Sequence, residues 1–258
     1  MKSKEMINWG CLLLLFYNIP IAFSQCPADL KLVEDSLCML PFDEPASYCE
    51  AHNKCHAEGV KRGIRMFLAG MHANKLVSKL QTMSYTLTGI NRLLRDVGDF
   101  YSSWVANDPG CSPCLVENDT IIWQPGDHDR FPERRIIVCN VARCMPVTQS
   151  IAYSNFVCEM SNYTQSKKWK TTVYKTDWPV KITDPFMPDS QNTGCFETYH
   201  NSTILLCSKI CQTNEACRSF YHNNVTQTCH LAMHVDSRLS GSLRNSSGSW
   251  VRFAKRDF

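Results

Sequence analysis

The sequence lacks the motifs of the common enzyme classes and has little net charge. It contains no G-x-S-x-G nucleophile elbow and no glycine-rich phosphate loop. His230 and His234 have the spacing of a metalloprotease motif, but the glutamate that would follow the first histidine is absent. The formal net charge is only +3, which gives no basis for a nucleic-acid partner. These absences argue against catalysis and favour a protein that acts by binding.

Long hydrophobic runs are also missing, apart from one near the N-terminus. A basic start is followed by the apolar stretch CLLLLFYNIPIAF and then by small residues before Gln25. This order is typical of a signal peptide, here over residues 1–24. The stretch is shorter than the roughly 20 residues that a membrane-spanning helix needs, so we expect no transmembrane anchor. The charged C-terminal stretch SWVRFAKRDF is unlike a lipid-anchor signal, and the sequence predicts a secreted, extracellular protein.

Cysteine, in contrast, is abundant. Of the 15 cysteines, Cys11 lies within the predicted signal peptide, which leaves 14, an even number. In an oxidising compartment an even set predicts a disulfide framework. Five N-x-S/T sequons favour the same compartment, and they predict surface glycans at Asn118, Asn162, Asn201, Asn224 and Asn245.

These cysteines fall into two blocks separated by a polar stretch without cysteine. Nine belong to the N-terminal block and five to the C-terminal block. Removal of the 24 signal residues from 258 leaves 234, a length that suits two domains. We expect an edge strand near residues 171–174 of the stretch between them. The predicted organisation is a first domain over residues 25–160, a linker over 161–194 and a second domain over 195–258.

The C-terminal block starts with a short helix pattern. In STILLCSKICQTN, Ser202 or Thr203 is a suitable N-cap, and Cys207 and Cys211 are four residues apart on one helical face. A strand that begins at Cys217, a polar turn and a second strand follow. The C-x3-C and C-x11-C spacings are poor for zinc ligands, so we predict a disulfide-bonded helix and hairpin.

This run resembles a PAN or apple-type module, in which a helix with paired cysteines is tied to a hairpin. The resemblance covers residues 195–258 and implies the pairs Cys207–Cys229 and Cys211–Cys217. Modules of this family usually close with a cysteine pair that joins their two ends. Here the tail NSSGSWVRFAKRDF contains no cysteine, so Cys195 lacks its usual partner.

The N-terminal block combines helix and strand patterns. Two cysteines bracket an alternating stretch, CPADLKLVEDSLCML, which predicts a hairpin. We expect a first helix from Pro45 to Gly59 and a second over residues 72–83. Five short strand patterns follow: YTLTGIN, DFYSSWV, TIIWQ, RRIIVCN and SNFVCEM. Two helices followed by several short strands predict an α+β domain rather than a parallel α/β domain.

The order of these patterns resembles a C-type lectin-like domain. Residues 87–91 stand where the family has W-I-G-L-N, although Leu87 replaces the tryptophan. Residues 123–126 match its W-x-P-G, and residues 156–159 match its terminal F-V-C-E. The resemblance therefore implies a disulfide-stapled, C-type lectin-like α+β fold, followed by the PAN/apple-like helix and hairpin.

The lectin resemblance also implies cysteine pairs. Cys26 and Cys38 correspond to the additional N-terminal pair of the long form of the family. A second bridge would join Cys55, or alternatively Cys49, to Cys158.

The remaining cysteines leave the pairing open. The family's inner pair would include Cys139, with Cys144 as the nearest partner. Cys111 and Cys114 form an additional C-x-x-C, which we expect to be structural because no thioredoxin-like βαβ pattern surrounds it. Nine and five are both odd, so complete pairing needs a link between the blocks. We predict that Cys195 makes this link to an unassigned cysteine; alternatively it and one other cysteine are free or form a homodimer.

A candidate ligand site follows the W-x-P-G motif. In sugar-binding members of the family, the next three positions include ligands of calcium, and here they hold Asp127, His128 and Asp129. Carboxylate oxygens are the ligands that calcium prefers. However, the usual proline is absent, and the W-N-D motif expected before Cys158 has no counterpart. Calcium at Asp127 and Asp129 is therefore the one cofactor that the resemblance implies, with fewer ligands than a strong site takes.

The two resemblances imply a secreted recognition protein that binds glycans or glycoproteins through the loop from Cys111 to Arg135. In this loop Trp123 would stack on a sugar or protein face, or would pack in the core instead. Asp127, His128 and Asp129 complete the predicted ligand-binding set. The alternatives are calcium-independent binding of a protein receptor and a structural role in a matrix, because one fold hosts many functions. We expect no enzymatic activity.

Overall fold

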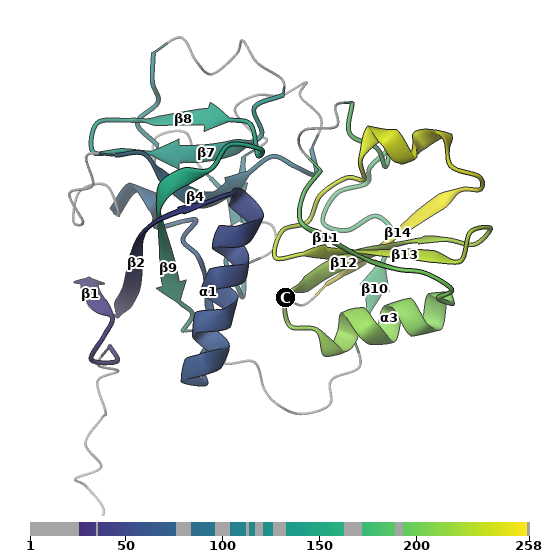
Figure 1. The fold of residues 1–258 in the computed structure, drawn as a ribbon, viewed down its shortest axis with the longest axis horizontal. Coiled ribbons are helices and arrows are strands. Elements are labelled where there is room, and N and C mark those ends of the chain that lie inside the picture. Colours follow the sequence, from purple (N-terminus) through teal and green to yellow (C-terminus); the bar gives the residue numbers. More distant parts are fainter. Residues whose placement is uncertain are drawn as a thin grey trace, which may run out of the picture.

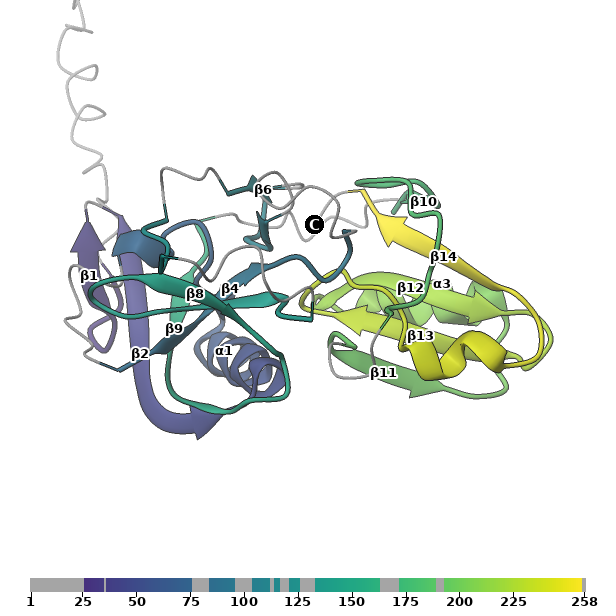
Figure 2. The ribbon, with the colours of Figure 1, turned by 90° about the horizontal axis from the view of Figure 1, so that it is seen from above.

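The chain folds into two units that lie side by side (Figure 1). The computed structural model describes residues 26–34, 36–75, 84–95, 104–111, 114–116, 121–125, 133–162, 172–188 and 193–256. Figure 2 shows the same two units from above. Both combine a helix with mainly antiparallel strands, so the predicted α+β class is confirmed.

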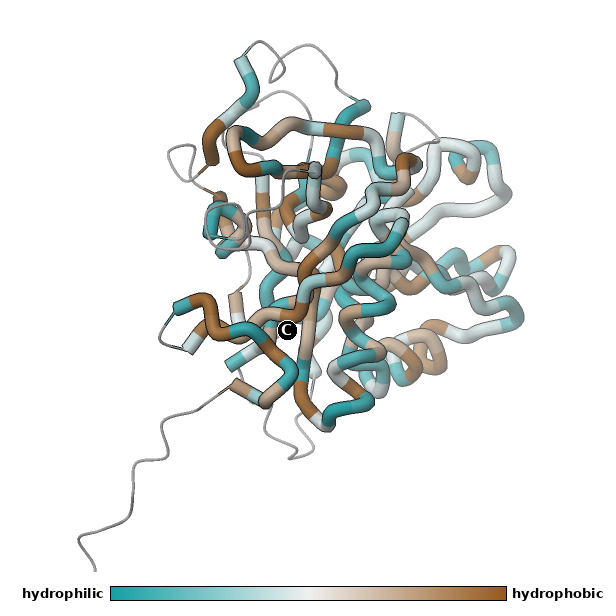
Figure 3. Tube along the Cα trace, turned by 60° about the vertical axis from the view of Figure 1, so that its left-hand side comes forward, coloured by the Kyte–Doolittle hydropathy of each residue, from teal (hydrophilic) through white to brown (hydrophobic). Residues whose placement is uncertain are grey.

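Hydrophobic stretches along the trace are short and alternate with hydrophilic residues (Figure 3). Among the described residues, no helix is long and apolar enough to cross a membrane.

The N-terminal unit begins with a disulfide-closed hairpin. β1 (Lys31–Glu34) pairs antiparallel with β2 (Leu37–Ala46), and a bond between Cys26 and Cys38 holds the hairpin at its base. β2 then continues along β9 (Tyr153–Met160) in antiparallel register. The predicted hairpin is confirmed, and its disulfide is the pair that the lectin resemblance implied.

Helix α1 (Tyr48–Arg62) covers one face of this sheet, but its ends differ from the predicted ones. Ser47 and Glu50 form a capping box, so the helix starts after β2, and Pro45 belongs to the strand. Gly59 lies inside the helix rather than at its end. A Cβ at Gly59 would lie 2.7 Å from the backbone nitrogen of Met66, so this glycine permits close packing against the next strand.

The remaining strands complete one mixed sheet. They are β3 (Met66–Leu68), β4 (Thr86–Asn91), β5 (Val105–Ala106), β6 (Cys114–Leu115), β7 (Ile136–Cys139) and β8 (Cys144–Val147). The main strand order is β1-β2-β9-β4-β5-β6, with β3 on β9 and β7 between β4 and β8. β4 and β9 pair in parallel, which requires a long crossover between them.

Three of the five predicted strand patterns, YTLTGIN, RRIIVCN and SNFVCEM, are confirmed as β4, β7 and β9. DFYSSWV is described only from Trp104 and contributes the short β5. The described part of TIIWQ forms a single bridge, between Trp123 and Cys144. Residues 76–83 of the predicted second helix lie outside the described residues, as does the predicted signal peptide.

Buried apolar side chains and a disulfide join α1 to the sheet. Phe156 of β9 is fully buried and stacks on Phe42 of β2 at 4.6 Å between ring centroids. Beside it, Cys55 of α1 is bonded to Cys158 of β9. Burial of each large apolar side chain stabilises the fold by roughly 1.5–3 kcal/mol. Cys55, rather than Cys49, is therefore the partner of Cys158.

The C-terminal unit is a five-stranded antiparallel sheet with α3 (Ile204–Thr213) packed on one face. Its strands are β10 (Tyr174–Lys175), β11 (Phe196–Tyr199), β12 (Cys217–Asn223), β13 (Thr228–Met233) and β14 (Trp250–Lys255), and a 3-10 helix η3 spans Gly241–Asn245. The strand order is β10-β14-β12-β13-β11. The N-cap of α3 is Thr203.

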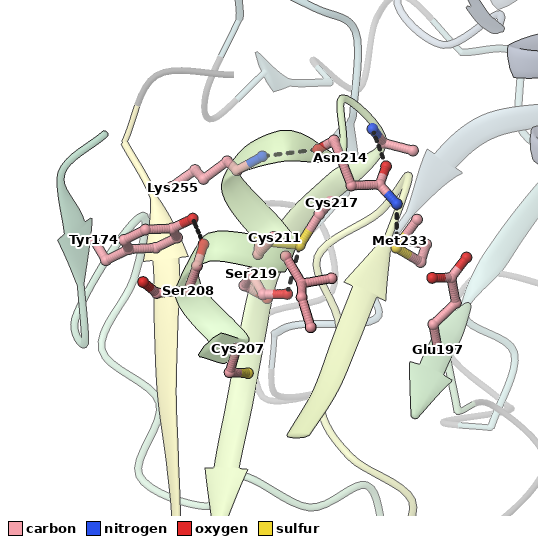
Figure 4. Close-up of a disulfide and its surroundings, with 12 residues drawn as sticks. Tyr174, Glu197, Cys207, Ser208, Cys211, Asn214, Cys217, Ser219, Met233 and Lys255 are labelled. Atoms are coloured by element: carbon pink, nitrogen blue, oxygen red, sulfur yellow. Dashed lines mark hydrogen bonds between the residues drawn. A yellow bond between two sulfur atoms is a disulfide. The ribbon is translucent and has the colours of Figure 1, made fainter. Parts of the chain in front are cut away.

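Two disulfides tie α3 to the hairpin of β12 and β13. They join Cys207 to Cys229 and Cys211 to Cys217, the pairs that the PAN resemblance implied. Figure 4 shows three of these cysteines among the surrounding side chains, with Cys207 and Cys211 on α3 and Cys217 at the start of β12. The helix contributes little buried apolar area of its own, since Leu205 is 78% exposed. The two covalent bonds therefore carry much of its attachment to the sheet.

The described part of the predicted linker belongs to this second sheet. Tyr174 lies in β10, which pairs with β14, and its hydroxyl donates to the carbonyl of Ser208 at 2.9 Å (Figure 4). Farther along, Met187 is fully buried, and its N–H donates to the carbonyl of Leu239 at 2.7 Å. The edge strand was predicted near residues 171–174, and β10 starts at Tyr174. The described part of the segment packs on the C-terminal unit.

A disulfide between Cys49 of α1 and Cys195 joins the two units. Beside it, the Gln149 side-chain nitrogen donates to the carbonyl of Gly194, and the N–H of Gly194 donates to the Gln149 side-chain oxygen, both at 3.0 Å. The predicted link from Cys195 to the first domain is present, and its partner is the cysteine left over when Cys55 bonds to Cys158.

Histidines from both units meet at the same junction. The rings of His52 on α1 and His234 after β13 stack at 5.4 Å between centroids, and His234 shares a 2.7 Å hydrogen bond with the Asn53 side chain. Burial lowers the pKa of His234 to about 3, with His56 and Arg218 adding positive charge nearby. Neutral imidazoles therefore form part of this contact.

Candidate functional site

The loop predicted to bind ligand is described only at its two ends. Asp127, His128 and Asp129 lie outside the described residues, as does Asn118. Before them, Trp123 is half-buried, and its ring lies 5.8 Å from that of Trp104. The described contacts of Trp123 are thus with the core of the unit, and a stacking role toward a ligand stays a prediction.

Disulfides and backbone pairing fix both ends of this loop to the sheet. Cys111 is bonded to Cys114, and Cys139 is bonded to Cys144. The N–H of Gln124 donates to the carbonyl of Cys144 at 2.9 Å. On the other side, the N–H of Arg135 donates to the carbonyl of Val147 at 3.0 Å. The segment between Pro125 and Glu133 therefore leaves from and returns to fixed positions.

A second candidate site is a cleft of about 490 Å³ at the ends of β3 and β9, beside the β1–β2 hairpin. Its lining includes polar groups from four separate segments of the chain. At its floor, His72, Asp108 and Glu159 each offer a ligand atom, and these atoms lie within 4.8 Å of one another. The cleft brings together residues that no single sequence motif contains.

Glu159 is held in this cleft by the strand that carries it. It directly follows Cys158 in β9, so the bond to Cys55 anchors its backbone. Its side chain is buried, and its Oε1 lies 2.8 Å from Nδ1 of His72. This hydrogen bond raises the pKa of His72 above its ordinary value, since the carboxylate stabilises the charged imidazolium.

Asp108 completes the cluster from the turn after β5. The side chain is 6% exposed, and its Oδ2 accepts the N–H of Met71 at 3.0 Å. Burial, and after it the negative charge of Glu159, raises the pKa of Asp108 to about 7. Gly70 permits this approach, because a Cβ there would collide with the Asp108 carboxylate.

Sequence reasoning missed these three residues. The sequence pattern places His72 in a helix, Glu159 belongs to the F-V-C-E motif, and Asp108 belongs to no pattern. Each lies in a different segment, and only the sheet brings them together. The one usable signal was Glu159, a charged residue within the otherwise apolar β9 stretch FVCEM.

The predicted glycosylation sites are on the surface wherever they are described. Asn162, Asn201, Asn224 and Asn245 are all exposed. Asn162 also lies at the rim of the cleft, near Ser36 of the β1–β2 hairpin. Glycans at these four positions would not disturb the core.

The histidines with metalloprotease spacing do not share a site. His230 lies in β13, with its Nδ1 2.7 Å from the hydroxyl of Thr198 and its ring 4.9 Å from that of Trp250. Burial lowers its pKa to about 4. His234, in contrast, contacts Asn53 of the other unit. The two side chains therefore have separate packing roles.

The helix, the hairpin and their two disulfides agree with a comparison to known families. Residues 192–256 match the model of the PAN domain. This part of the C-terminal unit is a PAN domain. The match begins three residues before Cys195, the first cysteine of this domain. A comparison with curated protein sequences gives no match.

Solved structures similar to this chain are C-type lectin domains. The carbohydrate-recognition domain of cow CD23, solved in the presence of a GlcNAc2Man3 oligosaccharide, is 14% identical with a TM-score of 0.39 and covers 54% of this chain and 98% of its own. The lectin CEL-I from Cucumaria echinata is 15% identical with a TM-score of 0.40, over 54% and 99%. The domain of the mouse scavenger receptor C-type lectin is 15% identical with a TM-score of 0.37, over 55% and 100%. Because these TM-scores are below 0.5, we draw no conclusion on ligand binding from them.

Proposed function

We propose that this chain is a secreted recognition protein that binds glycans or glycoproteins through a lectin-like domain over residues 25–160. Residues 1–24 act as the signal peptide, and the PAN domain serves as an accessory binding module. The seven disulfides, the PAN match and the exposed sequons support an extracellular location. Lectin-like and PAN domains are typically binding modules, and we propose no catalytic step.

The observation that supports this proposal is that the chain is bonded to the sheet on both sides of the predicted ligand residues, within the loop from Cys111 to Arg135. Backbone hydrogen bonds of Gln124 and Arg135 hold the chain on the sheet on both sides of residues 126–132. A loop on a rigid base can present side chains to a ligand with little loss of entropy on binding. We assign ligand contacts to Asp127, His128 and Asp129, with Asp127 and Asp129 also holding calcium.

A glycan array tests this assignment. The full-length secreted protein is screened with calcium and again with a chelator, and Asp127→Ala is compared with Asp177→Ala. Asp177 is an exposed aspartate of the C-terminal unit, so its substitution controls for the change in charge. We expect binding that needs calcium and is lost in Asp127→Ala but not in Asp177→Ala.

Other outcomes of the array revise the proposal in different ways. Binding that survives the chelator and Asp127→Ala would place the glycan site outside this loop. No glycan binding in either condition would favour a protein receptor, and saturable binding to one purified protein would then separate this role from that of a matrix component.

A further inference from the structure

We propose that His72, Asp108 and Glu159 bind a divalent transition-metal ion at the floor of the cleft, with Zn²⁺ as the best match to their donor atoms. The proposal is independent of the proposed glycan function, because the cleft shares no residue with the predicted calcium ligands. It rests on donor type, donor spacing, unsatisfied buried oxygens and an open side for a further ligand.

The donor atoms are of the right type and already close together. Nδ1 of His72 and the two carboxylates lie within 4.8 Å of one another. Zinc takes histidine nitrogen and carboxylate oxygen at about 2.0–2.2 Å, so ligands of one ion lie roughly 3–4 Å apart. Small side-chain movements would bring the three donors to that spacing.

Two oxygens of the cluster have no other role in the described structure. Oδ1 of Asp108 and Oε2 of Glu159 are buried, and neither has a hydrogen-bond partner among the described residues. Asp108 and Glu159 are 6% and 5% exposed, so water contacts them little. A buried carboxylate oxygen without a partner is costly, and a cation is the group that offsets this cost for both at once.

The surroundings orient the ligands. The N–H of Met71 binds Oδ2 of Asp108 and leaves Oδ1 for the ion. Lys75 on the cleft wall pairs with Glu34 of the β1–β2 hairpin.

The geometry favours zinc over calcium. Calcium takes six to eight oxygen ligands, whereas this cluster offers one nitrogen and two carboxylates. A set of three protein ligands with an open fourth position is typical of an accessible zinc site. Here the fourth position faces the cleft, where a water molecule or an oxygen atom of a bound molecule can enter.

The test uses the full-length secreted protein after treatment with a chelator and dialysis. Zn²⁺ is added in a calorimetric titration, first without and then with excess Ca²⁺. We expect one saturable site per chain and an affinity that calcium leaves unchanged. A titration without a saturable site would overturn the proposal, as would displacement of zinc by calcium.

Matched variants assign the site. Asp108→Asn and Glu159→Gln keep the shape of each side chain and should lower zinc affinity by at least about 100-fold, the upper end for residues that only support a ligand. His72→Gln should have a similar effect. His200→Gln, an exposed histidine of the C-terminal unit, is the control and should bind like the parent. Parent-like affinity in Asp108→Asn and Glu159→Gln would contradict the assignment.

A measurement on the unmodified protein covers the case in which a variant misfolds. Co²⁺ replaces Zn²⁺, and the visible absorption of the bound ion reports its coordination number. We expect the intense bands of a four- or five-coordinate ion with nitrogen and oxygen ligands. A weak spectrum like that of Co²⁺ in water would overturn the proposal, whatever the variants do.

Discussion

The PAN domain and the N-terminal unit differ in how far apart in the sequence their helix-to-sheet disulfides reach. In the PAN domain the two disulfides span 22 and 6 residues and join α3 to the hairpin beside it. In the N-terminal unit the bond between Cys55 and Cys158 spans 103 residues, and β4 pairs in parallel with β9. The bonds that tie the helix to the sheet are thus short-range in the PAN domain and long-range in the N-terminal unit.

Contacts between distant segments of the chain can create a site that no short sequence motif contains. Distant pairing brings separate segments to one edge of the sheet, and in this way His72, Asp108 and Glu159 meet in one cleft. In the PAN domain a buried ion pair joins Arg252 of β14 to Asp236, which lies after β13. The cleft is therefore a feature of the N-terminal unit.

The sharpest test of the comparison removes one disulfide from each unit. Replacing Cys55 and Cys158 together by serine should lower the free energy of unfolding by about 4.7 kcal/mol, because the bond closes a loop of about 100 residues. The same change at Cys211 and Cys217, which are 6 apart, should cost about 2 kcal/mol. Urea unfolding measures the free energy of unfolding of both variants. Equal decreases would contradict the expected difference between the two units.

The next effect concerns the buried ion pair of the PAN domain. Asp236 accepts hydrogen bonds from Ser219 and Arg252, and Arg252 also donates to the carbonyl of Trp178. Asp236→Ala would leave a guanidinium that is only 2% exposed without its counter-charge. We expect a loss of about 3–5 kcal/mol in urea unfolding. A loss below about 1 kcal/mol would mean that this pair does not hold the sheet together.

The sequence predicts some features of the two units and misses others. The sequence pattern predicts helix α3 with Ser202 or Thr203 as its N-cap, because these residues are near one another in the chain, and Thr203 is the cap. The two family resemblances, rather than local spacing, imply both PAN disulfides and the distant pair Cys55–Cys158. The bounds of α1 were wrong because Ser47 provides a better cap than Pro45 and because Gly59 serves close packing. The cleft was missed entirely, since its three ligands become neighbours only through the sheet.

The junction between the units should respond to pH. The pKa of His234 is lowered to about 3, below its ordinary value of 6.5, so the unfolded chain binds a proton first as pH falls. Its contribution to stability is present above about pH 6.5 and is lost as pH falls toward 3, by at most about 1.4 kcal/mol per pH unit. His52, whose pKa is also lowered by burial, adds in the same direction.

His234→Asn isolates this effect, because a backbone φ of 62° suits asparagine. Urea unfolding at several pH values should give a shallower slope for the variant than for the parent. Asp108, whose pKa is raised to about 7, contributes the opposite slope between about pH 4 and 7, and it is unchanged in both proteins. Identical slopes would mean that His234 is not buried at the junction.

The smallest effect is expected at the surface of the C-terminal unit. Arg244 and Asp184 form an ion pair at 2.6 Å, with side chains 50% and 40% exposed. Water screens such a pair, so Asp184→Ala should change the free energy of unfolding by less than about 1 kcal/mol. Urea unfolding in parallel with Asp236→Ala gives the contrast, and a loss equal to that of Asp236→Ala would contradict it.

The central claim is that a disulfide bonds the N-terminal unit to the C-terminal unit. Mapping the disulfides of the secreted protein tests this claim most directly. Proteolysis without reduction, followed by mass spectrometry, should yield a peptide with Cys49 bonded to one with Cys195, across 146 residues. Cys55 should appear bonded to Cys158. A free Cys195, or Cys195 bonded to a second copy of the chain, would contradict the account.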